Sequence, residues 1–393
     1  MNNINPLLSI VVPTKNRYKY LIHLIKLIKS FGSNEIELVI QDNSDNNDEI
    51  MDFLSNEKSE NIKYFYQSEK LSMSKNSDFA ILNSKGEYVC FIGDDDGVCH
   101  NILECVKWMK KNNIEALRSR RASFVWGDSI KNPKKINNAT DCVLYNKPSA
   151  KFTYLNPKKE LDNILRKGFQ SIDFIPIVYN GIVKRSILDN VFEIGKTFFP
   201  GGSPDISNGV VLSFFVNKMV FVDFPIIISG TSKMTGGGIH KQKGQSVPLE
   251  KVDFIERSVV ENWERDFPKI WAGRLAWPES GIKALRYVNQ PEYIKKLNKN
   301  YMFAAFSLYF LQYKKIGYKY APNKFYFIFY FIFLLFSNGV RVIKNKIISC
   351  ILRKKYAGRF IKRNITDIET AASFLTSIVK DFDFYKLKYY KSK

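Results

Sequence analysis

Three consecutive carboxylates, Asp94, Asp95 and Asp96, follow an apolar segment at residues 87–92 and are followed by Gly97. Adjacent like charges repel one another, so such a cluster favours a bound cation. Open α/β sheets bind ligands at the carboxyl ends of their strands. The run therefore predicts a site in which Asp94 and Asp96 hold Mg²⁺ or Mn²⁺ beside a phosphorylated ligand. The alternative is an Asp-rich turn, because Asp and Gly both favour turns.

Three further residues stand at expected element ends, where ligands bind. Asp42 follows the apolar run 36–40, and it either accepts hydrogen bonds from a nucleobase and ribose or caps an Asx turn. Lys75 lies near an expected helix start, where it either neutralises a diphosphate or is a solvated lysine. Asp205 precedes an apolar stretch that predicts a helix to about residue 217. It is either a general base or the helix N-cap, and Asp128 is the second candidate for the base.

Alternating strand and helix patterns must position these residues. Apolar runs predict strands at residues 8–12, 36–40, 62–66 and 87–92, and helical spacing predicts helices at 20–29, 47–55 and 74–83. Such alternation with short connections predicts a parallel sheet covered by helices. A strand at 122–126, a helix at 161–167 and a strand or hairpin at 220–229 follow. We therefore predict an α/β domain over residues 1–244 and a mainly α-helical accessory region over 245–393.

Charge is distributed unevenly between these two regions. The net charge of +22 divides into about +4 for residues 1–240 and about +18 for residues 241–393, and no acidic residue occurs between Glu292 and Asp367. Such asymmetry predicts an anionic partner for the second region. The five cysteines form no CxxC pair, which favours a reducing compartment over a disulfide scaffold or a zinc site.

An uncharged segment within the basic region extends from Phe325 to Val340 and begins with twelve consecutive apolar or aromatic residues. Its 16 residues are fewer than the roughly 20 that a spanning helix needs. It is either a buried helix of the accessory region or a helix lying in the plane of a membrane. Basic flanking residues and the lack of acids favour the membrane surface.

Several of these segments resemble, in order and spacing, the motifs of family 2 glycosyltransferases of the GT-A fold, of the bacterial surface-polysaccharide type. The segments that carry the resemblance are residues 9–17, 38–44, 74–77 and 80–96. The first resembles the nucleotide-contacting turn of that family and the second its base-binding strand end. In the third, Lys75 replaces the usual Arg. In the last, Gly93 stands where the first Asp of the DxD metal motif is usual, which shifts the expected ligand pair to Asp94 and Asp96.

The resemblance implies a role for each matching residue. Contacts to the nucleotide-sugar are expected from Pro13, Thr14, Arg17, Asp42, Lys75, Asp94 and Asp95. Asp205 matches the catalytic base of inverting relatives, and His240 is the candidate for a late metal ligand. The implied enzyme is an inverting, metal-dependent glycosyltransferase that uses a nucleotide-diphosphate sugar, most simply a UDP-sugar. The basic aromatic region implies a membrane-anchored glycan acceptor, a lipid-linked oligosaccharide or lipopolysaccharide.

The charge asymmetry also allows a different class of function. A basic region rich in Tyr and Phe can grip phosphates and stack bases, as nucleic-acid-binding proteins do. However, residues 325–336 are continuously apolar, whereas a base-stacking groove alternates aromatic residues with charge. We therefore expect an anionic membrane surface and no nucleic acid as partner, with the protein cytoplasmic and peripheral on the inner face of the cytoplasmic membrane.

Overall fold

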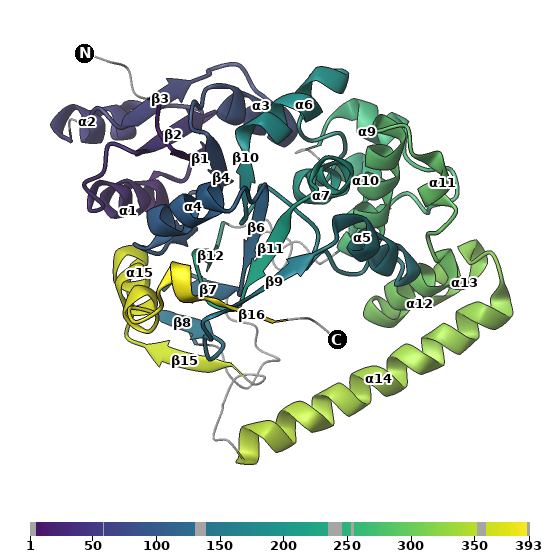
Figure 1. The fold of residues 1–393 in the computed structure, drawn as a ribbon. Coiled ribbons are helices and arrows are strands. Elements are labelled where there is room, and N and C mark those ends of the chain that lie inside the picture. Colours follow the sequence, from purple (N-terminus) through teal and green to yellow (C-terminus); the bar gives the residue numbers. More distant parts are fainter. Residues whose placement is uncertain are drawn as a thin grey trace.

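The computed structural model describes residues 5–57, 59–129, 139–234, 246–252, 255–351 and 359–390. Its first part alternates strands and helices as predicted (Figure 1). The elements are β1 (Leu8–Thr14), α1 (Tyr18–Lys29), β2 (Ile36–Asp42), α2 (Asp48–Asn56), β3 (Ile62–Tyr66), α3 (Met73–Leu82), β4 (Tyr88–Phe91), β5 (Gly97–Val98) and α4 (Ile102–Lys111). The apolar side chains of β1 and β2 are buried, as expected for strands with helices on both faces.

The central sheet has nine strands in the order β16-β9-β11-β6-β10-β4-β1-β2-β3. The neighbours β4, β1, β2 and β3 are parallel, so their carboxyl ends lie at one edge. Thr14 and Asp42 are paired at this edge. The acidic run follows β4 at the same edge, because Val11 is paired with Phe91. This parallel half of the sheet therefore brings the polar strand ends together.

Residues 116–231 contribute further strands to this sheet and most strands of a second sheet. Its elements are β6 (Ala116–Ser119), β7 (Ala122–Val125), β8 (Cys142–Tyr145), β9 (Lys151–Leu155), α5 (Pro157–Arg166), β10 (Ile182–Lys184), α6 (Arg185–Gly195), α7 (Pro204–Phe215), β11 (Met219–Val222) and β12 (Ile227–Thr231). The pattern at 220–229 is not a hairpin, because β11 pairs in the nine-stranded sheet and β12 in a five-stranded sheet. The order of the latter is β15-β8-β7-β12-β5.

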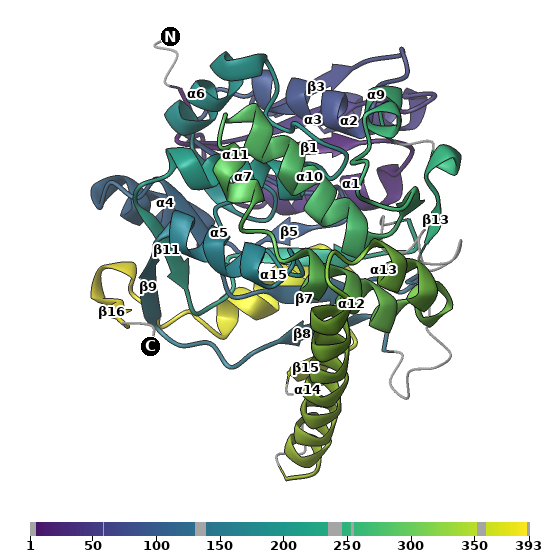
Figure 2. The same ribbon diagram turned by 90° about the vertical axis from the view of Figure 1, so that its right-hand side faces the viewer.

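Helices dominate the residues after 246. The elements are β13 (Val247–Pro248), η1 (Leu249–Lys251), α9 (Arg257–Glu261), β14 (Ile270–Trp271), α10 (Gly273–Tyr287), α11 (Pro291–Ile294), α12 (Lys299–Tyr309), η2 (Leu311–Tyr313), α13 (Lys314–Tyr320) and α14 (Lys324–Ile351). Helix α10 packs against α7, and α12 packs against α14. Helix α14 projects from the body of the molecule in both views (Figures 1 and 2).

The last part of the chain returns to the first region. Strand β15 (Phe360–Arg363) pairs with β8, and β16 (Lys388–Tyr389) pairs with β9. Between them, α15 (Ile368–Ser377) packs on α1, and η3 (Phe384–Lys386) packs on α4. Residues 360–389, which the sequence assigned to the helical accessory region, thus extend both sheets of the first region. The charge and helix patterns could not show this, because strand pairing joins segments more than 200 residues apart.

Candidate active site

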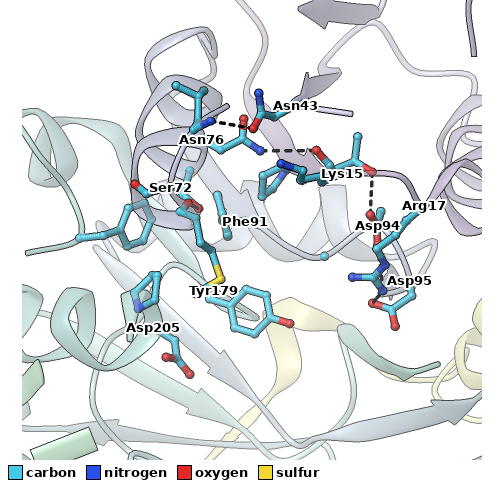
Figure 3. Close-up of a pocket in the computed structure, with 18 of the residues that line it drawn as sticks. Lys15, Arg17, Asn43, Ser72, Asn76, Phe91, Asp94, Asp95, Tyr179 and Asp205 are labelled. Atoms are coloured by element: carbon cyan, nitrogen blue, oxygen red, sulfur yellow. Dashed lines mark hydrogen bonds and ion pairs between the residues drawn. The ribbon is translucent and has the colours of Figure 1, made fainter. Parts of the chain in front are cut away.

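The strand ends described above line a cavity of about 910 Å³, within the size range of small-molecule sites. Of the residues expected to contact a nucleotide-sugar, Pro13, Thr14, Arg17, Asp94 and Asp95 line it. Asp205, the predicted base, lines it as well. Figure 3 shows these groups, with Tyr179 lying between Asp205 and the acidic run. The structure therefore brings the predicted base and part of the predicted donor site into one cavity.

Asp94 and Asp95 are held at the cavity by a shared arginine. Nη2 of Arg17 lies 3.0 Å from Oδ1 of Asp94 and 2.9 Å from Oδ1 of Asp95. The other carboxylate oxygens accept hydrogen bonds from the hydroxyl groups of Thr14, at 2.7 Å, and Ser232, at 2.7 Å. Burial lowers the pKa of Arg17, but the neighbouring aspartates outweigh it and raise the pKa overall. Arg17 therefore stays charged and keeps two carboxylates close together.

Asp96 differs from Asp94 and Asp95 in its position and in its contacts. Its Oδ2 accepts a hydrogen bond from the Gly93 amide at 2.8 Å, and its Oδ1 accepts one from the Gly230 amide at 2.7 Å. Its side chain is buried and does not line the cavity. Gly230 is needed at this contact, since a Cβ there would lie 1.8 Å from the carbonyl oxygen of Asp95. Asp96 thus ties the acidic loop to β12, while its two neighbours face the cavity.

The charge of the acidic run fits a divalent cation. Asp94, Asp95 and Asp96 are all at most 3% exposed, and among the residues that the structure describes Arg17 is the cation of the cluster, paired with Asp94 and Asp95. The ionised cluster therefore carries two uncompensated negative charges. Burial is the main cause that raises the pKa of Asp94 and of Asp96, and Asp95 adds to it in both. Carboxylate oxygens are preferred ligands of Mg²⁺ and Mn²⁺. Of the predicted pair of Asp94 and Asp96, Asp94 lines the cavity and Asp96 does not, so Asp94 and Asp95 are the carboxylates that could hold such an ion here.

The remaining predicted metal ligand is His240. His240 lies outside the described residues. Within the described ranges, no group of three or more His, Cys, Asp or Glu side chains is arranged to hold a metal ion. Two carboxylates with open cavity beside them still suit Mg²⁺, which usually keeps several waters and binds through one or two carboxylates plus phosphate oxygens.

The N-terminus of α3 forms a wall of the cavity next to the end of β1, where Nδ2 of Asn76 lies 3.5 Å from the carbonyl oxygen of Thr14. Ser72 is the N-cap, and its hydroxyl oxygen accepts a hydrogen bond from the Lys75 amide at 3.2 Å. Ser72, Met73 and Asn76 line the cavity, and Oδ1 of Asn76 is buried without a hydrogen-bond partner. A helix N-terminus favours a negatively charged group. This wall is therefore suited to a phosphate.

Asp42 and Lys75 are placed differently from the prediction. Asp42 is fully buried and accepts hydrogen bonds from the hydroxyl groups of Tyr18 and Tyr64, each at 2.7 Å, and from the Ser44 amide at 2.8 Å. It does not line the cavity, whereas its neighbour Asn43 does. Lys75 is exposed and lines a separate cavity on the other side of α3, together with Asp78. The sequence placed both residues at the right element ends but not their side-chain directions.

Asp205 lies in the first turn of α7. The N-cap of this helix is Ser203 and not Asp205, and the helix itself begins at Pro204. Oδ1 of Asp205 accepts a hydrogen bond from the Ile206 amide at 2.9 Å. Burial raises the pKa of Asp205, although Arg118 and Arg121 oppose this rise. A carboxylate with a raised pKa is a stronger general base near neutral pH.

The second candidate base and the nearby tryptophan are structural. Asp128 accepts a hydrogen bond from the Tyr20 hydroxyl at 2.6 Å and pairs with Lys19 at 3.1 Å, and it does not line the cavity. Trp126 is buried, and its indole N–H donates to the carbonyl oxygen of Asp95 at 2.9 Å. It therefore supports the acidic loop from behind and is not available to stack on a sugar.

Several residues at the cavity were not singled out from the sequence. These are Asn43, Lys70, Ser72, Asn76, Tyr179 and Phe199. Ser72 carried a recognisable signal, because a Ser before a helix start is typical of an N-cap. Tyr179 and Phe199 carried none. They come from irregular segments, and they reach the cavity by packing on Phe91, with ring centroids 6.1 Å and 5.6 Å away.

The first part of the chain matches the model of a known protein family. The family model described as "Glycosyl transferase family 2" matches residues 9–175. The resemblance to family 2 glycosyltransferases inferred from the motifs is therefore confirmed over these residues. The expected fold class is confirmed as well: an α/β domain of the GT-A type followed by a mainly helical region.

Two curated relatives are glycosyltransferases of bacteria. One is glycosyltransferase GlyG of Streptococcus pneumoniae, 29% identical over 103 residues, which are 26% of this chain and 34% of the relative. The other is the GalNAc(5)-diNAcBac-PP-undecaprenol beta-1,3-glucosyltransferase of Campylobacter jejuni. It is 31% identical over 110 residues, which are 28% of this chain and 35% of the relative. The matched segment thus spans about a third of the length of each relative.

Among solved structures, S. aureus TarS 1–349 in complex with UDP-GlcNAc is similar to the chain. Its TM-score is 0.44 at 16% identity, covering 79% of this chain and 87% of that one. The mannosyltransferase PcManGT from Pyrobaculum calidifontis, in complex with GDP-Man and Mn²⁺, has a TM-score of 0.40 at 13% identity. The two chains are covered to 96% and 88%. These scores add nothing to the family match.

Proposed function

We propose that this chain is an inverting glycosyltransferase that transfers a sugar from a nucleotide-diphosphate donor to a hydroxyl group of a membrane-anchored glycan. One observation carries the proposal. A single cavity is lined by the buried carboxylates of Asp94 and Asp95, by the N-terminus of α3 and, away from the acidic run, by Asp205. Displacement at an anomeric carbon needs these two functions: stabilisation of the leaving group and removal of the acceptor proton.

The donor is proposed to be a UDP-sugar. Its diphosphate would lie between the acidic run and the N-terminus of α3, where the helix dipole favours negative charge. Lys15 and Lys70 also line this side and bring positive charge. Asn43 links β2 to the segment before α3, since its Nδ2 donates to the carbonyl oxygens of Gln67, at 2.7 Å, and Glu69, at 2.6 Å.

The transfer step follows from the position of Asp205. Its carboxylate takes the proton of the acceptor hydroxyl as that oxygen bonds to the anomeric carbon. The bond from that carbon to the diphosphate oxygen breaks, and the nucleoside diphosphate leaves with the electron pair. Mg²⁺ or Mn²⁺ bound by Asp94 and Asp95 would supply positive charge next to the departing diphosphate. Arg17 orients this carboxylate pair and keeps it from repelling itself.

The acceptor is proposed to be a lipid-linked oligosaccharide or lipopolysaccharide at the inner face of the cytoplasmic membrane. Residues Lys324–Ile343 of α14 are long and apolar enough to cross a membrane, with a mean hydropathy of 1.8, and 6% of this window is buried. The low buried share of this window supports the membrane surface over the alternative of a buried helix. The name of the Campylobacter jejuni relative includes a PP-undecaprenol acceptor, which supports a lipid-linked acceptor for this chain.

The two faces of α14 explain this association. Phe327, Tyr330, Phe331 and Leu334 follow helical spacing and pack against the protein core. The opposite side is also apolar, since Phe325, Ile332 and Phe336 are 74%, 57% and 75% exposed. A helix that docks only on protein would carry polar residues there. The second apolar face, in a region with no acidic residue, fits an anionic membrane surface.

Hydrolysis of a panel of nucleotide sugars by the purified protein, with Mn²⁺ and without acceptor, tests the proposed function. Release of UDP from at least one UDP-sugar is expected, and a panel without any turnover or nucleotide binding would contradict the proposal. Co-sedimentation with anionic liposomes, set against a gel shift with single-stranded DNA, separates the membrane partner from the nucleic-acid alternative. Binding to DNA but not to liposomes would favour the alternative.

A further inference from the structure

A second cavity adjoins the candidate active site and is lined by arginines. Its volume is about 210 Å³, and Arg118, Arg120 and Arg121 line it. The two cavities share their walls: Tyr179 and Gly230 line the first, and their chain neighbours Asn180 and Ser229 line the second. Asp205 lies within electrostatic range of both Arg118 and Arg121. The arginine cavity is therefore on the acceptor side of the proposed base.

The guanidinium groups of this cavity are only partly neutralised. Arg120 is paired with Asp223, to which its Nε donates at 2.7 Å. Arg118 is 6% exposed, and its Nη1 donates a hydrogen bond to the carbonyl oxygen of Ile175 at 3.4 Å. Arg121 is exposed, and it has no ion pair with any described residue. Asp173 is the acidic residue that lines the cavity.

The arginines also repel one another. Burial and the charge of Arg121 both lower the pKa of Arg118, to about 10. Arg359, which precedes β15, approaches from the returning end of the chain; its Nη1 donates to Oγ of Ser123 at 3.5 Å, and Arg121 contributes to lowering its pKa. Buried like charges are costly unless a counter-ion joins them. An oxyanion placed among them would relieve that repulsion and accept several charge-assisted hydrogen bonds.

We propose that the arginine cavity is an anion-binding subsite for the acceptor, so that the acceptor carries a phosphoryl or carboxylate group close to the hydroxyl that is glycosylated. The inference rests on the proposed function, because only that function makes Asp205 the base for an acceptor. Oδ1 of Asn180 is buried without a hydrogen-bond partner at this cavity, and it offers an acceptor for a sugar hydroxyl. Arg118 and Arg121 are the residues that recognise the anion.

The test is a calorimetric titration of the full chain, saturated with UDP and Mg²⁺, with inorganic phosphate, pyrophosphate or glucuronate. Phosphate and pyrophosphate represent a phosphoryl group, and glucuronate represents an acidic sugar. Arg121→Glu, at an exposed position, is expected to weaken binding of the preferred anion at least about ten-fold. The matched control is Arg257→Glu, on α9, whose exposed side chain lines neither cavity; its affinity should change less than two-fold.

The outcomes separate the two proposals. UDP binding without anion binding, or equal weakening by both charge reversals, overturns the anion subsite and leaves the proposed function intact. Anion binding that depends on Arg121 without any UDP binding overturns the proposed function instead. Arg118→Met should also weaken anion binding, and circular dichroism checks its fold. If Arg118→Met unfolds, the anion affinity of Arg121→Glu alone tests the subsite.

Discussion

The acidic loop after β4 buries charged side chains, whereas helix α14 exposes apolar ones. Both are the reverse of the usual distribution in folded proteins. The loop buries three aspartates at 1–3% exposure, whereas α14 leaves Phe325 and Phe336 about three-quarters exposed. Charged groups are rarely fully buried without partners, and large contiguous apolar surfaces rarely face water. Each arrangement costs stability unless something outside the chain completes it. The comparison teaches that the two regions call for opposite surroundings: we propose a cation and a ligand beside the loop, and an apolar environment around the helix.

The largest effect is expected at the carboxylate pair. Asp95→Asn should reduce transfer roughly 10²–10³-fold, the size expected when a preorganised charged contact is lost, and leave thermal stability unchanged or higher. Asp52→Asn, on the exposed face of α2, is the control and should keep full activity. Donor hydrolysis and a thermal melt measure both properties. Full activity of Asp95→Asn would show that the buried charges serve the fold alone.

Asp96→Asn sharpens the comparison within the loop itself. Because both oxygens of Asp96 accept backbone N–H groups, an amide nitrogen in one of these positions would face a donor. We therefore expect this variant to lose stability by about 1–3 kcal/mol, with activity falling as a consequence. A denaturant titration of both variants separates the two roles. Equal stability of Asp95→Asn and Asp96→Asn would contradict the division of tasks derived from the contacts.

Loss of the base should reduce the rate without changing donor binding. Asp205→Asn is expected to lower transfer about 10²-fold or more with an unchanged dissociation constant for UDP, because Asp205 lies across the cavity from the acidic run. Single-turnover transfer and calorimetry measure the two quantities. A variant that transfers sugar at the wild-type rate would exclude Asp205 as the base.

The exposed face of α14 can be tested independently of catalysis. Phe333→Glu combined with Phe336→Glu should weaken binding to anionic liposomes at least about 100-fold, since each buried aromatic side chain contributes about 2 kcal/mol. Hydrolysis of the soluble donor should not change. The pair Met51→Glu and Leu82→Glu, at exposed apolar positions outside α14, is the control. Equal liposome binding by both double variants would show that α14 does not carry the membrane contact.

The last prediction concerns stability alone, at a buried acid in the helical region. Glu279 on α10 is fully buried, and burial raises its pKa from 4.5 to about 7, against the opposing charge of Lys283 at 3.5 Å. A raised pKa in the folded state means that stability is lost as pH rises from about 4.5 to about 7. Glu279→Gln should remove this loss, on the order of 3 kcal/mol at pH 8. Parallel pH dependences of unfolding for both proteins would contradict the assignment.

Much of the first region could be predicted from residue patterns. The strand at 62–66 matches β3, and the other predicted strands and helices of residues 8–92 lie within two residues of those observed at nearly every end. Periodicity is a local property, so it survives without knowledge of the tertiary structure. The predicted strand ends also located Thr14, Asp94 and Asp95 at one cavity, because parallel strands place their carboxyl ends together.

The sequence by itself determined which elements form and which residues stand at their ends. It also determined that the chain contains a run of three adjacent carboxylates and a long uncharged apolar segment. Only the tertiary structure decided that Asp95 faces the cavity while Asp96 binds β12, that Asp42 and Lys75 turn elsewhere, and that residues 360–389 extend both sheets. The physical reason is that side-chain direction in a loop depends on contacts from distant segments. Arg17, Gly230 and Ser232 supply those contacts here, and no spacing pattern along the chain encodes them.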